Sequence, residues 1–302
     1  MSKRVAVAGS SGLIGGALCR HLLGRGDQIV RLVRRPAAAP DEVRWSPSSG
    51  YLPPDALAGV DALVNLAGIG INARRWTGAH KAAIERSRVD ATGAVAQTLA
   101  RLQERMQRPV RLVNASAVGF YGDRGDEVLT EASHGGADFL SGVVARWEDA
   151  TRPATAAGVP VAVIRSGLVM TPDGGAFRPL LRLTRLGLAG PLGSGRQWWP
   201  WITLVDEVRA ITHLLDHPEL TGPVNAAAPE PHRQQEIAQA LAGALHRIAL
   251  VPAPRPALRL VIGEFADRIL DSQLVEPQQL LASGFTFEHP DLASAVTWLA
   301  DR

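Results

Sequence analysis

The sequence predicts an α/β fold, in which a doubly wound parallel sheet is followed by a smaller, mixed C-terminal lobe. Short apolar runs alternate with segments of helical periodicity through the first half of the chain. This alternation is typical of a parallel sheet covered by helices on both faces. Beyond residue 170 the alternation stops, and glycine, proline, arginine and tryptophan become frequent. This composition therefore predicts that the second half of the chain forms a less regular unit.

The first predicted strand, residues 5–8, runs directly into a glycine-rich turn and then into a predicted helix over residues 13–23. Gly9 and Gly12 allow a tight turn and let the backbone approach a pyrophosphate, and Gly15 lets the helix pack closely on the sheet. The positive N-terminal end of the helix would face the phosphates. This order predicts a Rossmann-type dinucleotide site, and a glycine-rich turn that binds nothing is the alternative. The residues predicted to line it are Gly9, Ser10, Ser11, Gly12, Leu13, Ile14 and Gly15.

Further strands and helices are predicted from apolar runs and from apolar residues at intervals of three and four. The strands are residues 28–33, 61–66, 111–115, 159–165 and 223–227, and the helices are residues 79–106, 139–157 and 204–215. Residues 171–201 predict an irregular lobe over the sheet edge. We therefore expect a dinucleotide-binding Rossmann core over residues 1–170 with returning segments at about 202–228, and a C-terminal substrate-binding lobe over residues 171–302.

The end of the second strand indicates which dinucleotide binds. Proteins that bind NAD usually carry an acidic residue about 20 positions past the glycines, where it holds the ribose 2′-hydroxyl. Arg34 and Arg35 stand there instead. Guanidinium groups form charge-assisted hydrogen bonds to a phosphate, whereas a carboxylate would repel it. The sequence thus predicts NADP(H), with Arg34 as the main selector and Arg35 as the weaker one; a solvated basic turn is the alternative.

Composition excludes several other classes of protein. The formal net charge is +3, and no basic run is longer than Arg34-Arg35, so no nucleic-acid partner is expected. The single cysteine, Cys19, excludes an internal disulfide. No stretch reaches the roughly 20 apolar residues of a membrane span, and no cluster of ligands predicts a metal site. We expect a cytoplasmic protein with a small-molecule substrate. Residues 79–106 and 139–157 could pair in a homodimer or could simply cover the sheet.

Several further motifs follow one another in a fixed order. They are Asn65-Leu66-Ala67-Gly68, Ser87-Arg88, Asn114-Ala115-Ser116, Tyr121-Gly122, Arg165-Ser166-Gly167, Gly195-Arg196-Gln197-Trp198, Trp201 to Asp206, and Gly222-Pro223-Val224-Asn225. The set resembles the atypical, epimerase-like branch of the extended short-chain dehydrogenase/reductases over nearly the whole chain. The resemblance implies that an NADP cofactor is lined by Leu66, Ala67 and Gly68, with Ala115 and Ser116 beside it, Arg88 near its ribose and Val169 near its nicotinamide.

The acid–base pair of ordinary members of that superfamily is missing. They carry Tyr-x-x-x-Lys on the helix after a serine-containing strand, but neither tyrosine of this chain is followed by a lysine four residues later. The two positions fall near Leu140 and Val144. The serine position falls on Ser116, or on Ala117 if the alignment shifts by one residue. General acid–base help is typically worth about 10²- to 10⁴-fold in rate, so its loss slows hydride transfer without forbidding it.

Other residues are candidate replacements, each with a structural alternative. Tyr121 is expected at the cleft mouth, as a proton donor or as a ring packed over the loop. Arg196 could bind an anionic substrate or remain solvated. Trp198, with its neighbouring tryptophans, could wall a substrate pocket or anchor the lobe. Asp206 is predicted to cap the helix that begins there.

Two functions fit this sequence. The first is an NADP(H)-binding, epimerase-like oxidoreductase of unknown small-molecule substrate that acts without the usual tyrosine and lysine. The alternative is a non-catalytic NADP(H)-binding sensor or scaffold protein. Turnover of NADPH that depends on a substrate would separate them.

Overall fold

The computed structural model describes residues 2–106 and 110–302, and its centre is a seven-stranded sheet in the order β11-β7-β5-β4-β1-β2-β3. Every neighbouring pair in this sheet is parallel. Strand order reverses beside β1, which is the mark of a doubly wound fold. The predicted α/β fold with its parallel sheet is confirmed. The strands are β1 (Arg4–Ala8), β2 (Gln28–Val33), β3 (Glu42–Arg44), β4 (Ala62–Asn65), β5 (Arg111–Ala117), β7 (Val161–Ser166) and β11 (Gly222–Ala226).

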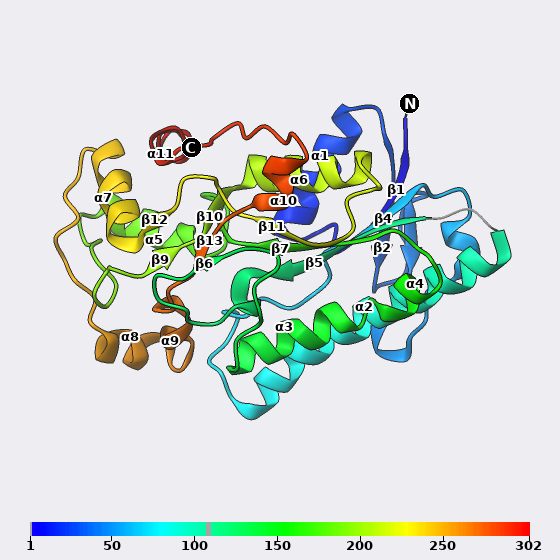
Figure 1. The fold of residues 1–302 in the computed structure, drawn as a ribbon, viewed down its shortest axis with the longest axis horizontal. Helices are drawn as coiled ribbons and strands as arrows, with labels where there is room; N and C mark the ends of the chain where they lie inside the picture. The colour runs from blue at the N-terminus through cyan, green and yellow to red at the C-terminus, as the bar shows by residue number, and fades with distance from the viewer. Residues whose placement is uncertain (1, 107–109) are drawn as a thin grey trace.

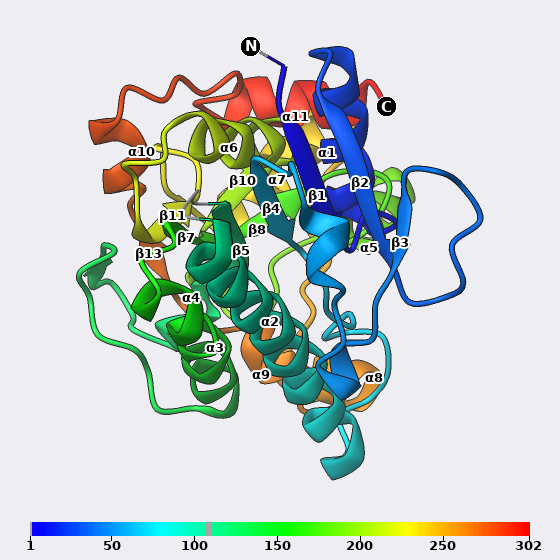
Figure 2. The ribbon, with the colours of Figure 1, turned by 90° about the vertical axis from the view of Figure 1, so that its right-hand side faces the viewer.

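Helices cover both faces of the sheet. Figures 1 and 2 show α1 (Leu13–Gly24) and α6 (Leu204–Asp216) on one face, and α2 (Gly78–Met106), α3 (Phe139–Asp149) and α4 (Arg152–Ala156) on the other. The side chains of β1 alternate between two cores, because successive residues of a strand point to opposite faces. Val5 and Val7 belong to the core under α1 and α6, whereas Ala6 and Ala8 belong to the core under α2.

The C-terminal lobe lies beyond the carboxyl ends of the strands, at the left of Figure 1. Its core contains Phe177, Trp199, Trp201 and Ile237, all at most 6% exposed. Its elements are β8 (Leu168–Met170), α5 (Phe177–Arg185), β9 (Trp198–Trp199), β10 (Trp201–Thr203), β12 (His232–Arg233), α7 (Gln234–Ala244), α8 (Arg255–Ile262) and α9 (Phe265–Ile269). Beside them lie β6 (Val128–Leu129), β13 (Leu274–Val275), α10 (Gln278–Ala282) and α11 (Leu292–Ala300).

The structure corrects the predicted elements in two places. Residues 139–157 form two helices instead of one, because Pro153 lies in the first turn of α4 and has no N–H to donate to an earlier carbonyl. Residues 171–201 contain a regular helix, α5, which buries Phe177, Leu180 and Leu181 and exposes its arginines. The three-residue strand β3 was not predicted, because so short an edge strand has little apolar pattern.

No helix among the described residues is both long enough and apolar enough to cross a membrane.

The glycine turn is formed by close backbone contacts. Gly9 has φ of +80°, and a Cβ atom added there would lie 2.7 Å from the carbonyl oxygen of Leu66. A Cβ atom on Gly15 would lie 2.2 Å from the carbonyl oxygen of Gly9. Both contacts are with backbone, which cannot move aside like a flexible side chain. Glycine is therefore required where α1 meets β1 and β4.

We predict that Gly15→Ala lowers the free energy of unfolding by roughly 1–3 kcal/mol, because the new methyl group must displace backbone. Gly24→Ala is the matched control: a Cβ there meets nothing within 4 Å, and alanine is favoured over glycine in a helix by up to about 1 kcal/mol. Urea denaturation of both variants measures the difference. Equal effects of the two substitutions would contradict the contact.

Candidate functional site

The carboxyl ends of β1, β4, β5 and β7 meet at the edge of the sheet that faces the C-terminal lobe (Figure 1). The glycine turn follows β1, residues 66–68 follow β4, and residues 167–169 follow β7. Ligands of open α/β sheets bind in the crevice at this edge. Apart from Arg88, which lies on α2, the predicted cofactor residues therefore come from neighbouring strand ends and the turns that follow them.

The N-terminus of α1 has the features of a phosphate site. Its N-cap is Gly12, which offers no side-chain hydrogen bond, and its first turn has no acidic residue. Ser11 and Gly12 are exposed to solvent. The first N–H groups of a helix have no partner within the helix, and the helix dipole is positive there. The residues present thus fit the pyrophosphate of a dinucleotide.

The two arginines after β2 differ in whether their guanidinium groups are paired. Arg35 forms an ion pair of 2.6 Å with Glu42, and this contact lowers the pKa of the Glu42 carboxyl to about 2. Arg34 is exposed, and its guanidinium makes no hydrogen bond or ion pair in residues 2–106 and 110–302. Of the two predicted selectors, Arg34 is thus the one available for a 2′-phosphate.

Arg88 lies across the turn after β4. A Cβ atom added to Gly68 would lie 3.4 Å from Cγ and Cζ of Arg88, so glycine makes room for this side chain. Arg88 donates a hydrogen bond to the carbonyl oxygen of Ile84 (3.1 Å), and its guanidinium stands 5.1 Å from the ring centroid of Trp147. Burial lowers its pKa to about 10. It remains a cation beside the turn where the resemblance places the cofactor ribose.

The Ser116 side chain points toward α3. Its hydroxyl donates to Oε1 of Glu148 on α3 (2.6 Å), and Glu148 also pairs with Arg165 of β7 (2.8 Å). The Arg165 side chain is only 4% exposed. Ser116 is therefore part of a buried ion-pair network that joins β5 and β7 to α3.

Tyr121 belongs to the same network. Its side chain is completely buried, not at the cleft mouth as predicted. Its hydroxyl donates to Asn225 (2.7 Å) and accepts from Arg165 (3.0 Å). Burial raises the pKa of its phenol. The position expected for Tyr121 was wrong, because the chain turns inward at Val118–Phe120 and carries the ring under the loop.

The positions expected for the tyrosine and lysine pair lie on α3. Val144 is 4% exposed and packs in the interior, and Leu140 is half-buried. Gly119 lies close to Leu140: a Cβ atom added to the glycine would be 4.0 Å from Cβ of the leucine. Apolar packing thus replaces acid–base chemistry on this helix.

A different acid lies at the end of β7. Ser166 is the last residue of that strand, and its Oγ lies 2.5 Å from Oε1 of Glu207 on α6. Glu207 is completely buried, and its second oxygen, Oε2, has no hydrogen-bond partner among the described residues. Burial raises the pKa of this carboxyl to about 7. Sequence reasoning missed the pair, although the acidic pair Asp206-Glu207 at a predicted helix start was a visible signal.

Asp206 is not the helix cap. Thr203 holds that position, and its hydroxyl accepts a hydrogen bond from the backbone N–H of Asp206. The Asp206 carboxylate instead accepts the backbone N–H groups of Glu288 and His289, at 2.7 and 2.9 Å. It therefore fastens a C-terminal segment to α6.

The predicted substrate residues lie in the lobe. Arg196 is exposed, and its carbonyl oxygen accepts a hydrogen bond from Arg233. Trp198 is half-buried, donates to Asp126 (2.7 Å) and lies under the guanidinium of Arg233. Trp199 and Trp201 are buried in the lobe core and anchor it.

An aromatic group that sequence reasoning missed lies between the lobe and α3. The rings of Phe139 and Phe265 lie 5.3 and 5.6 Å from that of Trp76. Lys81 stands over Trp76 and pairs with Glu264. Three segments far apart in the sequence meet there.

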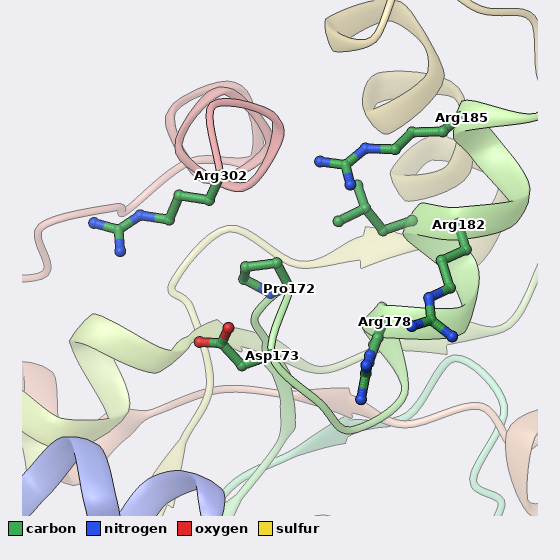
Figure 3. A pocket seen from close by; sticks show the side chains of 7 residues that line it. Pro172, Asp173, Arg178, Arg182, Arg185 and Arg302 are labelled. Carbon is green, nitrogen blue, oxygen red and sulfur yellow. The ribbon is translucent and has the colours of Figure 1, made fainter.

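A basic pocket of about 330 Å³ opens between α5 and the loop after β8. Figure 3 shows Arg178, Arg182 and Arg185 projecting from α5, with Pro172 and Asp173 beside them and Arg302 across the gap. The loop also contacts α1, since a Cβ atom on Gly174 would lie 3.3 Å from the Leu13 side chain. This pocket concentrates positive charge near the phosphate end of the predicted cofactor site.

These features define a class of protein. A doubly wound sheet, an uncapped helix after a glycine turn and a lobe over the carboxyl edge are typical of the extended short-chain dehydrogenase/reductases. UDP-N-acetylglucosamine 4-epimerase from Bacillus cereus has this fold, with a TM-score of 0.78 at 14% identity over 99% of this chain and 98% of that chain.

Comparison with known proteins narrows the class to a family. Residues 5–139 match the NAD dependent epimerase/dehydratase family, and residues 253–299 match a domain of unknown function, DUF1731. Epimerase family protein Mb2239 of Mycobacterium bovis is 41% identical over 99% of this chain and 98% of its own length. The mouse epimerase family protein SDR39U1 is 35% identical over 97% of this chain and 98% of its own length. The chain therefore belongs to the NAD-dependent epimerase/dehydratase family, in the SDR39U1-like group that carries DUF1731 at its C-terminal end.

A solved structure of this group supports the same assignment. The crystal structure of human epimerase family protein SDR39U1 (isoform 2) with NADPH has a TM-score of 0.90 and 34% identity, and the match covers 99% of both chains. The resemblance to the epimerase-like branch, drawn from the order of the motifs, is confirmed.

We predict that Glu148→Ala destabilises the protein by about 3–5 kcal/mol, because it leaves the Arg165 guanidinium buried without its counter-ion. The control is Glu127→Ala, since Glu127 is half exposed and its partner Arg124 is a quarter exposed. Such an exposed pair contributes about 0–1 kcal/mol. Denaturant unfolding measures both, and similar small losses would contradict the proposed importance of the network.

We predict that Glu207→Gln changes how stability depends on pH. Because the pKa of the buried carboxyl is raised, the unfolded chain loses this proton at lower pH than the folded protein, and stability falls as pH rises from about 4.5 to about 7. The full loss is about 3 kcal/mol. Glutamine does not titrate, so the variant should match the parent near pH 4.5 and exceed it at pH 8. Parallel stability curves for the two proteins would contradict this.

Proposed function

We propose that this protein binds NADP(H) across the carboxyl edge of the sheet and uses it as an epimerase-like oxidoreductase on a small-molecule substrate. The observation that carries the proposal is the uncapped, glycine-built N-terminus of α1, together with an exposed Arg34 that has no hydrogen bond or ion pair within the described residues. NADPH in the crystal structure of the human relative supports it.

The chain's own groups have distinct roles in this proposal. The N–H groups at the start of α1 bind the pyrophosphate, Arg34 binds the 2′-phosphate, and Arg88 lies on the ribose side. The cofactor supplies a hydride when it is bound. The lobe closes the crevice and excludes water, and the aromatic group around Trp76 gives the substrate region an apolar wall.

A second candidate function is binding of NADP(H) without turnover, as a sensor or scaffold protein. The observation that favours it is the apolar packing of Val144 and Leu140 at the positions of the usual acid–base pair. A screen of aldehydes and ketones with NADPH absorbance as the readout separates the two. Oxidation above the substrate-free rate supports the enzyme, and none across the screen favours the binding protein.

We predict that Arg34→Asp weakens NADPH binding by about 10- to 100-fold, because it removes a charge-assisted contact worth roughly 1.5–3 kcal/mol. NADH lacks the 2′-phosphate, so its affinity should change less than about threefold, well under 1 kcal/mol. Titration calorimetry with both dinucleotides measures the effect. Arg35→Ala is the control and should weaken NADPH binding much less, since Arg35 is held by Glu42. Equal losses for NADPH and NADH in Arg34→Asp would refute the assignment.

A further inference from the structure

We infer that Ser166 and Glu207 form a proton-holding pair beside the nicotinamide end of the crevice, in place of the missing acid–base residues. Glu207 holds the proton, and the Ser166 hydroxyl passes it to the substrate oxygen. This inference rests on the proposed binding of NADP(H). Ser166 is the group that would touch substrate, and Glu207 is a positioning residue that acts through it.

Strand register places Ser166 at the required position. Ala117 pairs with Ser166, and Ser116 pairs with Arg165 in the preceding row. Paired residues of parallel strands point to the same face, and successive residues point to opposite faces. Ser116 and Arg165 both reach Glu148 on the α3 face, so Ala117 and Ser166 face α6. The hydroxyl of Ser166 therefore stands next to Ala117, the alternative position for the family's serine.

Glu207 is isolated from other charges. Within residues 2–106 and 110–302 its one side-chain hydrogen bond is with Ser166, and desolvation is the main influence on the pKa of its carboxyl. Asp206 and Arg209, on the same helix, bind residues 286–289 instead.

The other elements packed against α6 present few ionisable groups. β8 and β10 have none, and those of α1, β5 and β7 form no hydrogen bond or ion pair with Glu207 within the described ranges; they are Cys19, Arg20, His21, Arg111 and Arg165. Within the described residues this carboxyl has one oxygen without a hydrogen-bond partner and no cation in contact, so burial favours its neutral form.

The proton and electron changes balance in this arrangement. When a hydride from NADPH forms the new C–H bond at a substrate carbonyl carbon, the π pair of the C=O bond moves to oxygen. That oxygen takes the hydroxyl proton of Ser166, and Ser166 takes the proton of Glu207. The substrate carbonyl is reduced by two electrons and NADPH is oxidised. Glu207 ends as a carboxylate near the positive nicotinamide ring of NADP⁺ and regains its proton from solvent.

The arrangement has a consequence that needs no substrate. The positive ring of NADP⁺ favours ionisation of Glu207, whereas the neutral ring of NADPH does not. Binding of NADP⁺ should therefore release a proton, and its affinity should rise with pH. The 2′-phosphate also titrates near pH 6, but both forms of the cofactor carry it. The difference in proton release between NADP⁺ binding and NADPH binding therefore isolates the contribution of the Glu207 carboxyl.

The test is titration calorimetry of the parent protein with NADP⁺ and with NADPH at pH 6.5, in two buffers of different ionisation enthalpy. We expect roughly half to three quarters of a proton more to be released by NADP⁺ than by NADPH. In Glu207→Gln that difference should vanish while both dinucleotides still bind. The control is Glu288→Gln, an exposed carboxyl near α6, and it should keep the difference.

Variants of Ser166 test the second member of the pair. Ser166→Ala removes the hydrogen bond that stabilises the Glu207 carboxylate, so the proton release on NADP⁺ binding should shift to higher pH. Ser166→Thr keeps a hydroxyl and should restore the pH dependence of the parent protein. Binding of both dinucleotides with equal proton release in parent and Glu207→Gln would overturn the inference and leave the proposed function intact. Failure of the parent to bind either dinucleotide would overturn the proposed function, and the inference with it.

Discussion

The close backbone contact between Gly15 and Gly9 is the constraint on which the rest of the structure depends. A Cβ atom at Gly15 would stand 2.2 Å from the Gly9 carbonyl oxygen, so only glycine lets α1 begin this near to β1. The contact places the helix N-terminus over the strand ends, with its N–H groups free of any side-chain cap. It also brings the turn against the end of β4. The predicted phosphate site thus depends on the same contact that packs the first helix.

Polar side chains at the neighbouring strand ends are divided between the two faces of the sheet. On the α3 face, the side chains form a buried hydrogen-bond network, which indicates a structural role. Its members are Ser116, Arg165, Glu148 and Tyr121. On the α6 face, Glu207 has one hydrogen bond and one oxygen without a partner among the residues that the structure describes. A satisfied buried network makes the fold rigid, whereas an unsatisfied buried acid is costly and is commonly found at functional sites. The two faces therefore suggest different roles for residues only one position apart.

Periodicity predicted most of the sheet, because buried parallel strands are continuous apolar runs with few alternative readings. Periodicity did not predict the helix α5, whose arginines lie on the exposed face while Phe177 and Leu180 lie on the buried face. It also failed to break the helix at residues 150–151, although Pro153 was visible. For the site, the glycine turn could be predicted because its chemistry is local, whereas the role of Arg34 as the selector of NADP(H) remains a prediction. The division between core and lobe at residue 170, the cytoplasmic location and a homodimer remain predictions.

The sequence by itself determined the class of fold, the glycine turn and the absence of the tyrosine and lysine pair, and it predicts NADP(H) as the cofactor. These depend on residue type and on spacing within one βα unit. Only the tertiary structure decided which of Arg34 and Arg35 is unpaired, that Tyr121 is buried, that Ser116 faces α3, and that Ser166 meets Glu207. The physical reason is that burial and pairing depend on tertiary contacts. Arg35 pairs with Glu42 on β3, the other contacts join segments 30 or more residues apart, and strand register, which no local pattern fixes, determines which face each side chain occupies.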